Sequence, residues 1–266
     1  MIHPLLLCLL ATLALAAEWT PIFVDEFDRD GAPDPAKWTY EEGFVRNREL
    51  QWYQPQNALC KDGLLVIEAR RETRPNPTYD ATSKDWRHQR PEIAFTSACL
   101  ISQGRFSFTY GRAEIRARID TRPGSWPAFW TLGVEQPYPE NGEIDIMEYY
   151  QGTLLANVFY GFGGKLRESV TKYPLRDFGG EAWAKEFHVW AMEWDPERIV
   201  LTLDGKVLNT FRVAVDDEPG KPNAFRKPHD LLINQAIGGN AGGDPGATVF
   251  PVRLEVDWVR VSQRKE

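Results

Sequence analysis

The sequence predicts an all-β protein, a sandwich of two antiparallel sheets, and three observations carry this prediction. Short segments rich in β-branched and aromatic residues recur between turn signals along most of the chain. One of them, RAEIRARID at residues 112–120, alternates charged with apolar residues, as a strand does when one face lies on the core. Patterns typical of helices are few. Many short strands with few helices favour two packed sheets.

The expected elements follow one another without a linker. The predicted strands are residues 63–70, 98–110, 111–120, 187–194, 198–208, 230–239 and 253–263. Asp62-Gly63 and Asp204-Gly205 are hairpin-turn dipeptides. Residues 73–92 are polar and interrupted by proline, so we expect a long surface loop there. Residues 179–190 could begin with one helical turn.

Length and composition favour one large domain. The chain has 266 residues, of which 42% are hydrophobic, and we expect a single catalytic domain over residues 17–266. The net charge of −7 argues against a nucleic-acid partner, because phosphate binding calls for a basic face. Ten tryptophans, nine tyrosines and fourteen phenylalanines suit both a core and a groove that stacks on flat ligands.

The first residues read as a targeting segment. MIHPLLLCLLATLALAA combines an apolar run with small residues at its end. We expect a signal peptide at residues 1–16, cut after Ala16, and hence a secreted or periplasmic protein with no membrane partner after cleavage. An uncleaved anchor is the alternative, but the run is short for a spanning helix.

The cysteines allow two interpretations. Cys8 leaves with the signal peptide, so the mature chain keeps Cys60 and Cys99. In an oxidising compartment these two form one disulfide; otherwise they are two buried free thiols. No spacing of cysteine and histidine resembles a zinc site.

Three carboxylates lie close together in NGEIDIMEYY, residues 141–150. Side chains of a strand alternate between faces, so Glu143 and Asp145 point the same way and strict alternation sends Glu148 to the core. Burying a charge there is costly. A one-residue bulge near residues 146–147 would return Glu148 to the face of the other two.

Such a surface can hydrolyse glycosides. Retaining hydrolysis needs two carboxyl groups about 5–5.5 Å apart, one as nucleophile and one as acid/base. Glu143 and Glu148 suit these roles, and the charge of Asp145 between them would help to keep Glu148 protonated. The alternatives are an acidic, solvated face of an edge strand and a calcium site.

The neighbouring motifs favour the catalytic interpretation. Together with the carboxylate segment, they resemble glycoside hydrolase family 16, the laminarinase-like β-glucanases, in the order NRELQWY, DGLLVIEAR, YGRAEIRARI, GSWPAFWTLG, GEIDIMEY, FHVWAMEWDPERI, LLINQAIGG and VDWVRV. The resemblance spans roughly residues 19–262. It implies a concanavalin-like jelly roll with an open concave cleft, in which Glu143 is the nucleophile, Asp145 its partner and Glu148 the acid/base.

The resemblance also implies contacts with a polysaccharide. The positions that match cleft residues of the family are Asn47, Trp126, Trp130 and Asn234. An indole can stack on the apolar face of a sugar ring, and an amide can bond its hydroxyls. We expect a monomer that needs no cofactor. Many family members hold a structural calcium, and the equivalent residues would be Asp257 by its side chain and Gly63 by its carbonyl.

The resemblance implies an endo-β-glucan hydrolase, most readily for β-1,3 bonds of the laminarin type. Two departures bear on the substrate: Phe159 stands where many laminarinases have histidine, and Gln235 follows the cleft asparagine. The family also includes enzymes for mixed-linkage glucans and for algal galactans such as agar, porphyran and carrageenan. A transglycosylase, or a binding sandwich without catalysis, is a further alternative.

Overall fold

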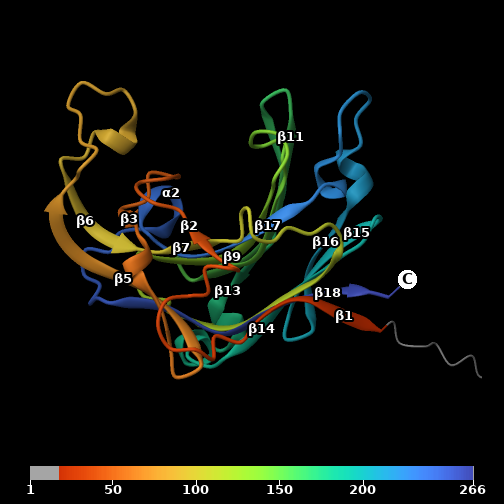
Figure 1. Cartoon of the computed structure of the whole chain (residues 1–266), viewed down its shortest axis with the longest axis horizontal. Helices are drawn as coiled ribbons and strands as arrows, with labels where there is room; N and C mark the ends of the chain where they lie inside the picture. Colours follow the sequence, from red (N-terminus) through yellow and green to blue (C-terminus); the bar gives the residue numbers. More distant parts are fainter. Residues whose placement is uncertain (1–17, 266) are drawn as a thin grey trace, which may run out of the picture.

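The computed structural model describes residues 18–265, which fold into two curved β-sheets packed face to face (Figure 1). The predicted signal peptide, residues 1–16, lies outside the described residues. All strand pairs are antiparallel except one short parallel pair. The predicted two-sheet sandwich is therefore confirmed.

The outer sheet has ten strands. Along its hydrogen-bonded order these are β16 (Lys206–Arg212), β15 (Arg198–Leu203), β14 (His188–Trp194), β8 (Gly111–Ile119), β18 (Val252–Arg264), β5 (Leu64–Pro75), β6 (Glu92–Ser97) and β3 (Gln51–Tyr53), with β1 (Trp19–Asp25) paired to β18 and β4 (Ala58–Lys61) paired to β5. The hairpins at Asp62-Gly63 and Asp204-Gly205 join β4 to β5 and β15 to β16, as predicted.

The inner sheet has eight strands and carries the concave face. Its order is β12 (Lys165–Ser169), β11 (Thr153–Phe162), β10 (Glu143–Tyr150), β9 (Ser125–Gly133), β17 (His229–Ile237), β7 (Cys99–Ile101) and β2 (Thr39–Tyr40), with β13 (Lys172–Pro174) paired to β11. The β11–β12 hairpin of this sheet and the loop of residues 76–91, which joins β5 to β6 of the outer sheet, both project upward in Figure 1 (green and gold).

Helical segments are short. They are α1 (Gly180–Ala184), α2 (Gly239–Gly242) and 3₁₀ turns at Pro55–Asn57, Trp86–His88, Leu175–Phe178, Val213–Asp216 and Ala224–Arg226. The single helical turn expected near residues 179–190 is α1. Within residues 18–265, no helix has the length and apolar composition needed to cross a membrane.

The hydrophobic core lies between the two sheets. In β8 every second residue is buried, including Ala113 and Ile115, as the alternating sequence predicts. β17 is buried at every position because one face lies on the core and the other forms part of the cleft floor. Each aliphatic side chain that becomes fully buried contributes roughly 1.5–3 kcal/mol to stability.

One strand prediction was too long. Residues 98–110 form only β7, which ends at Ile101, because the chain turns at Gly104 with a positive φ of 70°. The long surface loop is confirmed for residues 76–91, between β5 and β6. Cys60 and Cys99 are both buried and free in the described part of the chain, so the free-thiol interpretation holds.

Candidate active site

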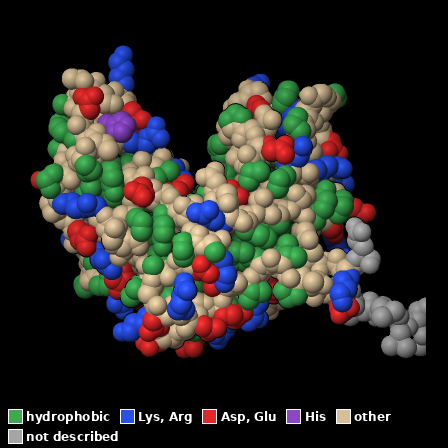
Figure 2. Space-filling view, viewed as in Figure 1, with side chains coloured by type: hydrophobic (Ala, Val, Ile, Leu, Met, Phe, Trp, Pro, Cys, Tyr) green, Lys and Arg blue, Asp and Glu red, His purple; other side chains and the backbone are tan. Residues whose placement is uncertain are grey.

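A cleft of about 620 Å³ lies on the concave face of the inner sheet. Figure 2 shows the molecule hollowed between two raised edges. All seven residues predicted to catalyse or to bind sugar line this cleft. The full lining is Arg46, Asn47, Glu49, Trp126, Ala128, Trp130, Leu132, Tyr138, Glu143, Asp145, Glu148, Tyr150, Asn157, Phe159, Glu168, Val170, Lys172, Asn234, Asn240 and Ala241.

A β-bulge brings the three carboxylates to one face. Asp145 pairs with Asn157 on β11, but Glu148 pairs with Leu155, so β10 carries one residue more than its neighbour over this stretch. The register against β9 shifts at the same place. Ile146 and Met147 at the bulge are fully buried in the core. The predicted bulge is confirmed, and the chain keeps its apolar residues inside while turning Glu148 to the cleft.

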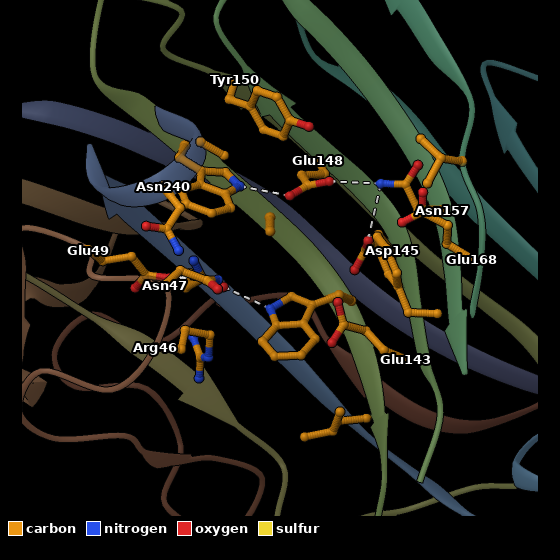
Figure 3. Close-up of a pocket in the computed structure, with 18 of the residues that line it drawn as sticks. Arg46, Asn47, Glu49, Glu143, Asp145, Glu148, Tyr150, Asn157, Glu168 and Asn240 are labelled. Carbon is orange, nitrogen blue, oxygen red and sulfur yellow. Dashed lines mark hydrogen bonds between the residues drawn. The ribbon is translucent and has the colours of Figure 1, made fainter. Parts of the chain in front are cut away.

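Hydrogen bonds fix the carboxylates. Nε1 of Trp126 donates to Oε1 of Glu148 at 2.8 Å. Nδ2 of Asn157 donates to Oε2 of Glu148 at 2.9 Å and to Oδ2 of Asp145 at 3.3 Å (Figure 3). Asp145 is also hydrogen-bonded to Glu143. Since two carboxylates cannot both accept, this last bond needs a proton between them.

Burial shifts the protonation of all three groups. It raises the pKa of Glu143 to about 7 and that of Glu148 to about 7. Burial, followed by the negative charges of Glu143 and Glu148, raises the pKa of Asp145 well above its usual range. The triad therefore retains protons near neutral pH, and Asp145 can donate a hydrogen bond to an ionised Glu143.

The two cations of the cleft act on different glutamates. The charge of Arg46 opposes the rise in the pKa of Glu143, while the charge of Lys172 does so for Glu148. For Glu143 the effect of Arg46 comes directly after burial, whereas Lys172 is the weakest of the influences on Glu148. The charge of Arg46 thus favours the ionised form of Glu143, the state that a nucleophile requires, while the negative charge of Glu143 favours the protonated form of Glu148, the state that an acid requires.

The predicted tryptophans are fixed by their indole N–H groups. Trp126 bonds Glu148 and packs edge-on against Tyr150, with ring centroids 5.7 Å apart. Nε1 of Trp130 donates to Oδ1 of Asn234 at 2.8 Å, and Nδ2 of Asn234 donates to the hydroxyl of Tyr53 at 3.1 Å. Asn234 thus orients Trp130 in addition to lining the cleft.

The fourth predicted residue, Asn47, lies in a tight turn with a positive φ of 53°. Its amide points to Oε1 of Glu49 at 3.4 Å, and Figure 3 shows it beside Asn240. Asn47 therefore lines the cleft opposite the side on which Asn157 and Glu168 lie.

Sequence reasoning missed several lining residues. Asn157, Tyr138, Glu168, Lys172 and Arg46 carry no motif of their own. Asn157 had one available signal, because it lies two positions before Phe159 and therefore on the same face of a strand. Its partnership with Asp145 depends on the register between β10 and β11, which the sequence does not display.

The two residues proposed as calcium ligands lie near each other, but their surroundings do not form a cation site. The pairing of β18 with β5 reaches Val256 opposite Leu65, which brings Asp257 close to Gly63. The carboxylate of Asp257 already forms an ion pair with Arg116. Within the described residues, no group of three or more His, Cys, Asp or Glu is placed to hold a metal. The structural calcium stays a prediction.

Comparisons with known proteins agree with this geometry. The family model described as glycosyl hydrolases family 16 matches residues 48–260. A β-glucanase from Rhodothermus marinus is 36% identical over 268 residues, covering 92% of this chain and 86% of the relative.

Two solved structures resemble the fold closely. The catalytic domain of an endo-1,3-β-glucanase (laminarinase) from Thermotoga petrophila superposes with a TM-score of 0.78 at 30% identity, covering 94% of this chain and 100% of that one. A structure reported with endo-acting O-glycanases of the human gut microbiota has a TM-score of 0.85 at 29% identity, covering 93% and 92%. The resemblance seen in the motifs is confirmed: this chain belongs to glycosyl hydrolase family 16 and is an endo-acting glycoside hydrolase.

Proposed function

We propose that this enzyme hydrolyses internal bonds of a β-1,3-glucan with retention of anomeric configuration. The observation that carries the mechanism is the bulge in β10, which places Glu143, Asp145 and Glu148 together on the cleft floor. The β-glucanase and laminarinase relatives support the choice of substrate.

The reaction runs in two displacements. In the first, the carboxylate of Glu143 attacks the anomeric carbon, the glycosidic C–O bond breaks, and Glu148 gives its proton to the departing oxygen. In the second, ionised Glu148 takes a proton from water, whose oxygen attacks the same carbon and releases Glu143. Glu148 ends protonated and Glu143 ionised, so both return to their starting states.

The neighbouring side chains prepare these states. The proton of Asp145 stabilises ionised Glu143 through their hydrogen bond. Trp126 and Asn157 hold the two oxygens of Glu148 in place. These bonds also favour the charged form of Glu148 that has to follow proton transfer.

A second candidate substrate is a mucin-type O-glycan. The TM-score of 0.85 to the O-glycanase-associated structure exceeds that of 0.78 to the Thermotoga laminarinase. Phe159 gives the cleft an apolar surface where the resemblance leads us to expect histidine. The same carboxylates would carry out the chemistry, so the two candidates differ only in the sugars that the cleft accepts.

The substrate experiment separates these candidates. The purified chain is incubated with laminarin, mixed-linkage glucan, agarose, carrageenan and mucin O-glycans, and new reducing ends are measured against the Glu143→Ser variant. We expect laminarin to be cut fastest, without the longer products of a transglycosylase. Cleavage confined to the O-glycans or to a galactan would overturn the β-glucan proposal.

We further propose export and a monomeric state. The apolar N-terminal run supports export, and mass spectrometry of protein recovered outside the cytoplasm would then find a chain that begins at Ala17. Retention of residues 1–16 would contradict it. Light scattering tests the oligomeric state, with a mass slightly below 30.4 kDa expected for the processed chain.

A further inference from the structure

Arg46 lies in a turn that is held by three hydrogen bonds from two other elements. Asn47 and Arg48 both have positive φ, 53° and 51°, so the backbone reverses sharply there. The amide N of Asn240, in α2, donates to the carbonyl of Asn47 at 2.9 Å. Arg90, from the loop of residues 76–91, donates to the carbonyls of Arg48 and Glu49 at 2.8 and 2.5 Å. The position of Arg46 is thus set by elements distant in sequence.

The guanidinium of Arg46 is fixed in turn by three side chains. It forms an ion pair with Glu41, and its central carbon lies 5.0 Å from the ring centroid of Trp130 and 5.9 Å from that of Tyr53. Only 23% of the side chain is exposed. A planar guanidinium can pair with a carboxylate and stack on an indole at once, which a lysine ammonium cannot do as well.

The charged and titratable groups around Glu143 come from several elements. Asp145 and Glu148 lie on its own strand, Tyr138 on the loop before it, Glu168 on β12, Lys172 on β13, and Arg46 and Glu49 in the turn region. Of the residues that line the cleft, only Arg46 and Lys172 are cations. Figure 3 shows Arg46 and Glu143 in the lower half of the cleft and Glu148 above them.

We propose that Arg46 is a positioning residue that keeps Glu143 ionised for nucleophilic attack while it holds the Trp130 ring as a platform for sugar. The inference rests on the roles assigned to Glu143 and Glu148 in the proposed function. It adds that the positive charge acting on Glu143 comes from outside β10, from a turn that precedes the catalytic strand by about a hundred residues.

The test compares Arg46→Gln and Arg46→Lys with Arg48→Gln. Arg48 lies two positions after Arg46 in the same turn but is exposed and does not line the cleft, so it is a matched control. The acidic limb of the kcat/KM profile reports the ionisation of Glu143. In Arg46→Gln we expect this limb to move to higher pH by at least about half a unit. Arg46→Lys should keep the limb near its original pH and raise KM, because it keeps the charge but loses the stacking.

A second readout does not depend on catalysis. Carboxyl carbons labelled in glutamate are titrated by NMR in the wild type and in each variant, with Glu143 assigned through Glu143→Gln. The Glu143 titration should move to higher pH in Arg46→Gln and stay in place in Arg48→Gln. An unmoved titration, or an equal shift in Arg46→Lys and Arg46→Gln, would overturn the role of Arg46. Absence of activity on every substrate with a shifted titration would instead refute the proposed function alone.

Discussion

The two sides of the cleft differ in how firmly their side chains are held. The fixed wall consists of Arg46, Asn47, Trp130 and Asn234. Arg46 stacks on Trp130 and pairs with Glu41, Trp130 donates a hydrogen bond to Asn234, and Asn47 donates one to Glu49. The open wall consists of Phe159 on β11, Glu168 on β12, Lys172 on β13 and Val170 between β12 and β13. Glu168 and Lys172 are both exposed, and neither forms an ion pair with another described residue.

The register relates the open wall to the catalytic residues. Glu143 pairs with Phe159, which pairs with Glu168, while Glu148 pairs with Leu155, which pairs with Lys172. An anion therefore lies in the row of Glu143 and a cation in the row of Glu148. We infer that the fixed wall holds the reaction geometry, while the open wall meets the part of the substrate that distinguishes one polymer from another.

The largest expected effect comes from the acid/base. Glu148→Gln cannot donate a proton, so kcat on a polysaccharide should fall by roughly 10²- to 10⁴-fold. An aryl glycoside with an acidic phenol needs little protonation and should lose much less in the first step. Rates on both substrates are compared by stopped assay. An equal loss on the two would contradict the role of Glu148.

The fixed wall should respond more strongly than the open wall. Asn234→Ala leaves the N–H of Trp130 and the hydroxyl of Tyr53 without their partner, and we expect kcat to fall by about tenfold or more. Phe159→His should leave kcat on the best substrate within a few fold and change the ratio of activities across substrates. If Asn234→Ala changed only the ratio of activities and left kcat unchanged, the claim that the fixed wall holds the reaction geometry would be contradicted.

The pH profile sharpens the comparison at the centre of the cleft. We expect kcat/KM to follow a narrow bell centred near pH 7, because Glu143 has to be ionised and Glu148 protonated, and the pKa of each is raised to about 7. Activity should fall below the acidic limb, where Glu143 is protonated. The two limbs belong to the coupled triad. A profile flat to pH 9 would contradict a raised pKa for Glu148.

The raised pKa of Glu143 should make the fold less stable as pH rises, whereas a carboxylate in a salt bridge makes a fold more stable. A carboxyl whose folded pKa lies above its unfolded value destabilises the fold as pH rises through that range. Glu143→Gln removes this cost, so its Tm should exceed that of the wild type at pH 8 by about 2–4 °C, the shift that about 1 kcal/mol causes in a domain of this size. At pH 4 the difference should shrink. A lower Tm at pH 8 would show that Glu143 stabilises the fold.

The smallest expected effect concerns the charge of the open wall. Glu168→Gln removes an exposed anion, so a sulfated oligosaccharide should inhibit the variant more strongly, by about two- to fivefold at low salt. The gain should vanish at high ionic strength because exposed charges are screened. Competitive inhibition constants at two salt concentrations measure this. Weaker inhibition of Glu168→Gln would place the recognition of charge elsewhere.

The sequence was informative where a local pattern has one structural outcome. Alternation in β10 required a bulge to bring Glu148 to the cleft, and the structure has it at Ile146 and Met147. The roles of Asn157 and Arg46 were not predictable in this way. Asn157 reaches Asp145 and Glu148 because β10 pairs with β11. Arg46 stacks on Trp130, which lies 84 residues further along the chain. Contacts of this kind are set by tertiary structure.

The most direct test of the central claim is the configuration of the first product. Proton NMR of an early digest, on the polysaccharide that gives the most reducing ends, shows which anomer forms before mutarotation. Two displacements at one carbon predict that the β-anomer appears first, from Glu143 and Glu148 acting as nucleophile and acid/base. An α-anomer in the first spectra would mean a single inverting displacement, and would contradict the roles assigned to the carboxylates of β10.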